Sequence, residues 1–468
     1  MGVAVTNSAL LHKKLHASKG KGGRRRAFEG SKLQEQEQQA RKAPMKQSPG
    51  ANQQWSHLLF LILLAGFGLR AFVAPQARVA GHEGHLMLNE DPMGRLKVYV
   101  YDIPSIFNKW VVQRDMRCLS HMFAIEIYMH LFLLSSSVRT FDPKEADWFY
   151  TPVYTNCDLT KTGLPFINNM PRMMRSAIQY ISTEWPFWNR TDGADHFFVV
   201  PHDFGACFHF QEKEAVERGI FPLLQRATLL QTFGQTNHSC LRNGSIVIPP
   251  YVSPRRSSNH TIPFNTPRST FAYFRGVFYD MNDSPKGDHY ARGIRAAIWE
   301  KYKNNALFDI SSEHPDTYYE DMQTSIFCLC PLGWAPWSPR LVEAVVFGCI
   351  PVIIADDIVL PFKEVIPWDD IAVFVPETDV DKLEHILTSI PVGEVTKKQR
   401  MMSDPRIKQA LLFPRPTYPG DGFHQVMNAL ARKLPHDSSI YLQLGQPSTL
   451  NWTAGNSSEF KPWQVPVL

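Results

Sequence analysis

The thirty residues from Phe327 to Asp356 constrain the fold of this chain more than any other segment. The segment FCLCPLGWAPWSPRLVEAVVFGCIPVIIAD consists of an apolar run, a loop, a helical pattern and a second apolar run. Ser338 followed by Pro339 is typical of a helix start, and Gly348 is typical of a helix end. Neither apolar run alternates with polar residues, which indicates strands covered on both faces. The segment therefore predicts a βαβ unit of a parallel sheet.

The start of this predicted helix favours a ligand site. In a parallel sheet such a helix start lies at the carboxyl ends of the strands, where free N–H groups and the helix dipole attract anions. Arg340 and Glu343 share one helix face, so the arginine can bind a diphosphate while the carboxylate accepts hydroxyl protons from a ribose. Trp337 and Ser338 precede them, and a tryptophan ring can stack on a sugar or uracil. The same spacing is common in solvated surface pairs, so spacing alone leaves both interpretations open.

Strand-like and helical patterns alternate through most of the chain, which predicts an α/β fold. Strands are expected near 96–103, 147–154, 196–201, 229–233 and 246–249, with helices at 121–134, 171–185 and 212–227. A segment rich in Pro, Ser and Asn interrupts this alternation, as expected of a linker. We therefore predict two Rossmann-like lobes, at 95–250 and 269–435, joined by a linker at 251–268 and followed by a tail at 436–468.

Several long segments resemble one family. They include LKVYVYDIPSIFN, RCLSHMFAIEIYM, SSVRTFDPKEADWFYTPVY, YFRG, CLCPLGWAPWSPRLVEA and GCIPVIIAD, between about Gly94 and Trp463. These segments are similar to the exostosin-like glycosyltransferases of family 47, and most similar to the plant irregular-xylem subgroup that builds the xylan backbone. The xylan glucuronosyltransferase-like subgroup is second.

This resemblance implies a GT-B architecture, in which two lobes face a cleft. It also implies transfer of xylose from UDP-xylose onto a β-1,4-linked xylan acceptor. Glucuronosyl transfer from UDP-glucuronate is the first alternative. The second is a non-catalytic subunit that forms a hetero-oligomer with other xylan glycosyltransferases.

The motif YFRG places Arg275 and Gly276 at the end of the first strand of the second lobe. The glycine allows the backbone to approach a ligand closely. The resemblance implies that Arg275 contacts the donor diphosphate. Together with Arg340 it would balance the charge of the departing UDP, so no metal or other cofactor is expected.

The first lobe is expected to bind the acceptor. In VVPHDFGACFH, His202 and Asp203 follow a predicted strand. An inverting transferase needs a group that takes the proton of the attacking hydroxyl, and we expect Asp203 to be this base, with His202 next. His121 and Glu126 are expected to contact the acceptor. Capping of loop amides by His202 and Asp203, and structural roles for His121 and Glu126, remain alternatives.

The N-terminal region predicts a membrane protein. Residues 1–50 contain eleven Lys or Arg against three Glu, and an apolar segment follows. The basic run lacks interleaved aromatic residues, so nucleic acid is not an expected partner. We predict a cytosolic tail at 1–56, a signal anchor at 57–74 and a stem at 75–94. The expected location is the Golgi membrane, with a single type II span and a lumenal catalytic part.

The lumenal part should be glycosylated and oxidised. All seven N-x-S/T sequons and all seven cysteines follow the predicted anchor. Glycosylation is expected at Asn189, Asn237, Asn243, Asn259 and Asn451. An odd number of cysteines leaves at least one outside any disulfide. Zinc is the competing interpretation, but Cys207-x-His209 and Cys328-x-Cys330 lack the usual ligand spacing, so no metal site is expected.

Overall fold

The computed structural model describes Gly94 and residues 96–208, 220–241, 243–253, 265–279 and 290–443. All of them belong to one compact unit, Gly81–Leu468. No helix within these residues is long and apolar enough to cross a membrane. The predicted cytosolic tail, the anchor and nearly all of the predicted stem lie outside the described residues.

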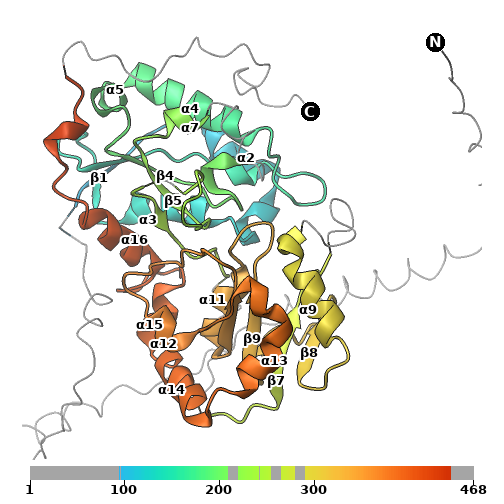
Figure 1. The fold of residues 1–468 in the computed structure, drawn as a ribbon. Coiled ribbons are helices and arrows are strands. Elements are labelled where there is room, and N and C mark those ends of the chain that lie inside the picture. The colour runs from blue at the N-terminus through green and yellow to red at the C-terminus, as the bar shows by residue number, and fades with distance from the viewer. Residues whose placement is uncertain are drawn as a thin grey trace, which may run out of the picture. The chain divides into compact units, whose positions relative to one another are not determined.

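The first lobe, in which Figure 1 labels β1, β4 and β5, contains a parallel sheet. Its described strands follow the order β2-β1-β3-β4-β5-β6. These strands are β1 (Val98–Val100), β2 (Arg139–Thr140), β3 (Trp148–Tyr150), β4 (His196–Val199), β5 (Thr228–Gln231) and β6 (Ile246–Val247). The pairing is parallel throughout, and Val98 pairs with Trp148 while Phe197 pairs with Thr228. Every residue of β3, β4 and β5 is buried, as expected for strands covered on both faces.

Helices flank this first sheet. They are α2 (Lys109–Arg114), α3 (Ile125–Ser135), α4 (Met170–Glu184), α5 (Phe187–Thr191) and α7 (Ile220–Leu223), with 3-10 turns η2 (Ser105–Phe107), η3 (Met116–Ser120), η4 (Thr155–Cys157) and η5 (Gly205–Cys207). Helix α4 begins with Pro171 in its first turn and buries one apolar face that includes Met174, Ile178 and Ile181. Helix α3 begins at Ile125 rather than at the predicted His121, because the chain before it forms η3 and a turn.

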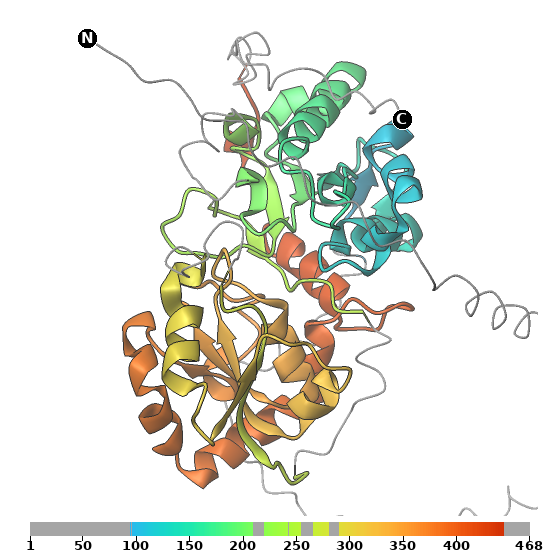
Figure 2. The same cartoon turned by 90° about the vertical axis from the view of Figure 1, so that its right-hand side faces the viewer.

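The second lobe contains the other parallel sheet, with the order β11-β10-β9-β7-β8 among the described strands. These strands are β7 (Thr270–Arg275), β8 (Phe308–Ser311), β9 (Ser325–Pro331), β10 (Ile350–Ile354) and β11 (Val373–Phe374). Helices cover both faces of this sheet (Figure 2). Strands β7 and β9 are neighbours although α9, β8 and α10 separate them in sequence.

The helices of the second lobe alternate with strands up to β11, and only helices and 3-10 turns follow β11 in the described chain. They are η6 (Tyr290–Gly293), α9 (Ile294–Tyr302), α10 (Tyr318–Gln323), α11 (Pro339–Phe347), α12 (Trp368–Ile371), η7 (Glu377–Lys382), α13 (Leu383–Thr388), α14 (Val392–Met402), α15 (Pro405–Ala410), α16 (Gly422–Ala431) and η8 (Ser438–Ile440). The predicted βαβ unit is present as β9, α11 and β10. The Ser338 side chain caps α11, Pro339 is its first residue, and Gly348 ends it in a left-handed conformation with φ of 73°. The bounds of α11 are therefore those that the Ser338 cap, Pro339 and Gly348 predicted.

The C-terminal part of the described chain returns to the first lobe. Phe423 of α16 stacks on Phe132 of α3, with 4.7 Å between ring centroids. After α16, Lys433 donates to the Gly244 carbonyl at 2.8 Å, and the Leu442 N–H donates to the Arg190 carbonyl at 2.9 Å. One hydrophobic core therefore includes residues of the first sheet, α16 and the second lobe.

Backbone hydrogen bonds also join the lobes away from α16. Residues 234–236 of the first lobe and 357–359 of the second form a short antiparallel bridge, in which the Thr236 N–H donates to the Asp357 carbonyl at 2.8 Å and the Val359 N–H donates to the Gly234 carbonyl at 2.9 Å. A Cβ on Gly234 would lie 2.2 Å from the Val359 carbonyl oxygen, so this contact requires a glycine.

Candidate active site

A cavity of about 380 Å³ lies between residues of the two lobes. Its lining residues from the first lobe and the segment after it are Ser120, Met122, Tyr251, Val252 and Ser253. The second lobe contributes Arg275, Gly276, Val277, Arg295, His314, Tyr318, Ser338, Pro339, Arg340 and Glu343. Five of the six residues predicted to bind a donor are therefore brought together at one cavity.

Arg340 is held against the end of β7. Its Nη2 donates to the Arg275 carbonyl oxygen, and its guanidinium carbon lies 4.3 Å from the centre of the Phe274 ring. Gly276 makes this approach feasible, because a Cβ there would lie 2.8 Å from Nη2 and its φ is 156°. The Arg340 residue is only 7% exposed, and its Nε has no hydrogen-bond partner. The guanidinium therefore retains an unused donor in a dry environment.

Glu343 is held by two tyrosines of α10. The Tyr318 hydroxyl donates to Oε2 at 3.0 Å, and the Tyr319 hydroxyl donates to Oε1 at 3.4 Å. Tyr318 packs in turn against His314, with 4.1 Å between ring centroids and the ring planes inclined by 31°. His314 is exposed and lines the cavity. The two hydroxyls fix the orientation of a carboxylate that can still accept further hydrogen bonds, since each of its oxygens has two lone pairs. No sequence motif indicated either tyrosine as part of the site.

Arg275 already has an anionic partner. Its Nη2 lies 2.7 Å from Asp309 Oδ1, and its Nη1 donates to the Asp309 carbonyl at 2.8 Å. The arginine side chain is 11% exposed and its guanidinium covers the Tyr273 ring at 4.5 Å. The carboxylate of Asp309 thus neutralises Arg275 in this structure, a contact that no sequence motif indicated.

Trp337 lies at the junction of the lobes and is not among the residues that line this cavity. Its Nε1 donates to the Asp203 carbonyl at 3.2 Å, and its ring lies 6.1 Å from that of Phe123. The neighbouring Ala335 is buried in the core of the first lobe. The loop before α11 therefore contacts the first lobe. Stacking of Trp337 on a bound sugar or uracil stays a prediction.

The two candidate bases lie beside this junction. His202 is buried, its Nδ1 accepts from the Phe204 N–H at 3.2 Å, and its ring is 6.2 Å from that of Phe123. Asp203 is half-buried, and burial raises its pKa to about 6. Neither residue lines the cavity, although Met122, which does, directly precedes Phe123. A carboxyl group that titrates near pH 6 can accept a proton at neutral pH.

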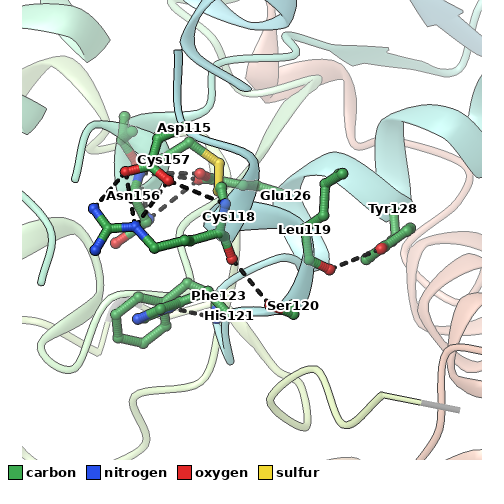
Figure 3. The surroundings of a disulfide bond; sticks show 12 residues. Asp115, Cys118, Leu119, Ser120, His121, Phe123, Glu126, Tyr128, Asn156 and Cys157 are labelled. Carbon is green, nitrogen blue, oxygen red and sulfur yellow. Dashed lines mark hydrogen bonds and ion pairs between the residues drawn. A yellow bond between two sulfur atoms is a disulfide. The ribbon is translucent and has the colours of Figure 1, made fainter. Parts of the chain in front are cut away.

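The two predicted acceptor contacts have different surroundings (Figure 3). His121 is half-buried beside Phe123, with 4.9 Å between their rings, and burial lowers its pKa. Glu126 is fully buried in α3 and accepts from the Asn156 N–H at 3.0 Å and from Asn156 Nδ2 at 3.1 Å. Burial raises the pKa of Glu126 to about 8. The placement of Glu126 does not support its predicted contact with an acceptor, because its oxygens face the protein interior.

Comparison with known proteins identifies the family. The family model described as "Exostosin GT47 domain" matches residues 92–390, which is more than half of the chain. The chain belongs to the exostosin family. It is therefore a glycosyltransferase of family 47, as the sequence motifs indicated.

Relatives of this exostosin-family protein align over most of its length. Probable beta-1,4-xylosyltransferase IRX10L of Arabidopsis thaliana is 64% identical over 87% of this chain and 98% of its own. Probable beta-1,4-xylosyltransferase IRX10 of the same species is 66% identical over 82% of this chain and 93% of its own. A probable glucuronosyltransferase of Oryza sativa subsp. japonica is 66% identical over 83% of this chain and 89% of its own. The solved structure of TarM aligns with a TM-score of 0.25 at 9% identity over 56% of this chain and 58% of that chain, which supports no conclusion.

Six of the seven cysteines of this exostosin-family protein form disulfides. The pairs are Cys118–Cys157, Cys207–Cys240 and Cys328–Cys349, and Cys330 is a buried free thiol. The odd cysteine predicted from the count is thus Cys330. Cys118, Cys157 and Glu126 cluster closely enough to suggest a metal site, but the two sulfur atoms are bonded to each other. The disulfides likewise occupy Cys207 and Cys328, two of the four residues considered for zinc.

Three of the predicted glycosylation sites fall within the described residues. Asn189, Asn237 and Asn243 are all exposed, as an acceptor for a glycan must be. Asn259 and Asn451 lie outside the described part of the chain.

Proposed function

We propose that this glycosyltransferase elongates xylan by moving xylose from UDP-xylose onto the end of a β-1,4-linked chain. The observation that carries the proposal is the cavity, where Arg340 and Glu343 lie on one face of α11 beside the end of β7. A guanidinium and a carboxylate at a helix start match the diphosphate and ribose of a nucleotide sugar. The Arabidopsis relatives named as xylosyltransferases support xylose as the sugar.

The proposed reaction assigns a role to each group. Glu343 accepts hydrogen bonds from the ribose, while Arg340 and Arg275 contact the diphosphate, with Gly276 allowing close approach and Ser338 capping the helix start. The acceptor hydroxyl oxygen attacks the anomeric carbon of xylose from the face opposite UDP, and Asp203 or, failing that, His202 accepts its proton. The bond between that carbon and the diphosphate oxygen breaks, and UDP departs with the electron pair. Guanidinium groups balance the growing charge, so we propose that no metal is required.

We also propose the GT-B arrangement for this protein. Each lobe has its own parallel sheet, the cavity is lined from both sides, and α16 returns the chain to the first lobe. In such an arrangement the second lobe binds the donor and the first lobe binds the acceptor, which agrees with the distribution of the cationic residues in the cavity.

Transfer of glucuronate is the second candidate function. The rice relatives and one from Physcomitrium patens are named probable glucuronosyltransferases, at 64–66% identity. A donor carboxylate needs a basic partner, and the exposed His314 lines the cavity beside Tyr318. A non-catalytic role in a complex with other xylan glycosyltransferases is a third candidate, which the arginine-rich cavity disfavours.

One experiment separates these functions. Full-length protein in detergent is incubated with UDP-xylose, UDP-glucuronate or other UDP-sugars and a xylo-oligosaccharide, with and without EDTA, and products are separated by mass. We expect the xylo-oligosaccharide to be extended by xylose when UDP-xylose is the donor and not with the other UDP-sugars. EDTA should not lower the rate of extension. Arg340→Gln serves as the control for contaminating activity. Transfer of glucuronate only, or activity equal in the control variant, would contradict the proposal.

We further propose that the protein is a type II Golgi membrane protein with a lumenal catalytic part. The basic N-terminus, the apolar segment after it and the later sequons support this topology. Protease added to intact microsomes should remove only about the first fifty residues, and an endoglycosidase should shrink the protected fragment. Protection of the N-terminus itself would contradict the topology.

A further inference from the structure

Arg295 lies in the first turn of α9 and reaches the cavity beside the ends of two strands. Its Nε donates to the Leu332 carbonyl at 2.8 Å, and its Nη1 donates to the Val277 carbonyl at 3.1 Å and to the Tyr290 hydroxyl at 2.8 Å. Its Nη2 makes only a long contact, 3.4 Å, with the Pro331 carbonyl. The residue is 6% exposed. Arg295 is therefore almost completely removed from water, yet one of its amino groups is weakly used.

The hydrogen-bond partners of Arg295 are all neutral groups. Within the described residues no carboxylate forms an ion pair with Arg295 or with Arg340, whereas Arg275 pairs with Asp309. Burial and, to a smaller extent, the nearby charge of Arg340 lower the pKa of Arg295 to about 10. With this pKa Arg295 still carries its charge at neutral pH. Among the described residues that line the cavity, three arginines face a single carboxylate, that of Glu343.

Such an arrangement is unfavourable unless a ligand completes it. A buried charge needs a partner of opposite sign, and two like charges in a dry site repel each other. Neutral carbonyls orient Arg295 but do not cancel its charge. A diphosphate supplies at least two negative charges and several acceptor oxygens, which suit the weakly used Nη2 of Arg295 and the unpartnered Nε of Arg340.

We propose that Arg295 is a diphosphate-binding residue of the donor site and acts together with Arg340. Arg275, which Asp309 neutralises, then contributes less to donor affinity than Arg295. This inference rests on the proposed use of a UDP-sugar, and it adds a residue that no motif of the sequence indicated.

The test compares ligands that differ only in phosphate. Full-length protein in detergent is titrated calorimetrically with UDP, UMP and uridine. We expect Arg295→Gln to weaken UDP binding at least tenfold, to weaken UMP binding less, and to leave uridine binding unchanged. The matched control is Arg292→Gln, because Arg292 lies three residues earlier, pairs with Glu377 and does not line the cavity. The control should bind UDP within twofold of the wild type.

The outcomes separate the inference from the proposed function. If wild-type protein binds UDP and Arg295→Gln binds it equally well, the inference is wrong and the proposed function stands. If the wild type does not bind UDP, the proposed function is wrong as well. An equal loss for UDP and uridine would indicate a structural role only, and would also overturn the inference.

A second variant covers the case in which Arg295→Gln does not fold. Arg295→Lys keeps the charge but cannot hold the three carbonyls and a phosphate at once. We expect it to melt near the wild-type temperature, to bind UDP at least threefold more weakly and to bind uridine normally. A lysine variant with wild-type UDP and UMP affinities would overturn the inference.

Discussion

Replacement of Asp203 by asparagine tests the proposed base most directly. Asp203 lies after β4 at the junction of the lobes, where its backbone carbonyl accepts a hydrogen bond from Trp337 Nε1. The asparagine variant keeps that carbonyl and nearly the same side-chain volume. The substitution should therefore remove a proton acceptor without moving Trp337 or the donor cavity.

The size and pH dependence of the effect follow from the surroundings of the carboxyl group. Burial raises its pKa to about 6, so at pH 7 about nine-tenths of the molecules carry the ionised, proton-accepting form. Loss of a general base lowers a rate by roughly 10²–10⁴-fold. Wild-type kcat/KM should rise with pH through about 6 and then level off. In Asp203→Asn the remaining rate should lack this acidic limb, while UDP affinity stays unchanged.

The assay is xylosyl transfer to a labelled xylo-oligosaccharide between pH 5 and 8, with UDP binding measured beside it. Asp102→Asn is a suitable control, because Asp102 is an exposed carboxylate that follows β1 in the same sheet. A normal rate in Asp203→Asn, or an unchanged acidic limb, would refute the assignment and make His202 the next residue to test. A similar loss of transfer rate in Asp102→Asn would show that the substitutions lower the rate by destabilising the first lobe.

Three further predictions concern other groups. Glu343→Gln should weaken UDP-sugar binding by about 1.5–3 kcal/mol, since a charge-assisted hydrogen bond to the ribose becomes neutral, and unchanged affinity and turnover would exclude the ribose role. Arg275→Ala should lower turnover by roughly 10²–10³-fold while UDP affinity changes less, and single-turnover kinetics beside UDP titration measure both. Glu126 binds its proton more tightly when folded, with a pKa of about 8, so its contribution to stability is present at acidic pH and lost as pH rises toward 8. Denaturant unfolding at pH 5 to 8 should show a decline of at most about 1.4 kcal/mol per pH unit that is absent from Glu126→Gln, and parallel profiles would contradict the buried protonated carboxyl.

The βαβ unit shows what local signals predict well. The cap, the proline and the terminal glycine of α11 act through backbone atoms within a few residues of themselves, so their effect can be read without knowledge of the rest of the fold. Gly276 differs, because the side chain that it accommodates, that of Arg340, is distant in sequence. Strand bounds were predicted too long, as with Leu96–Ile103 for β1, because an apolar residue can be buried beside a strand without pairing in the sheet.

The surroundings that the sequence did not predict depend on contacts across the sheet or between lobes. Glu126 was expected at the acceptor, but α3 is buried on nearly all sides, which directs the carboxylate to Asn156 instead. Trp337 was expected beside the donor, but the lobes meet at its ring. Tyr318 reaches Glu343 only because α10 packs beside α11.

Residue patterns predicted the family, the alternation of strands and helices, and the presence of Arg340 and Glu343 on one face of a capped helix. Each of these depends on residues close together in the chain. Only the folded chain shows that β7 pairs with β9, that Asp309 neutralises Arg275 and that Arg295 lies buried near Arg340. Strand order and helix packing result from burial of apolar surface over the whole unit, which is not directional, so no short pattern specifies which distant charges will meet.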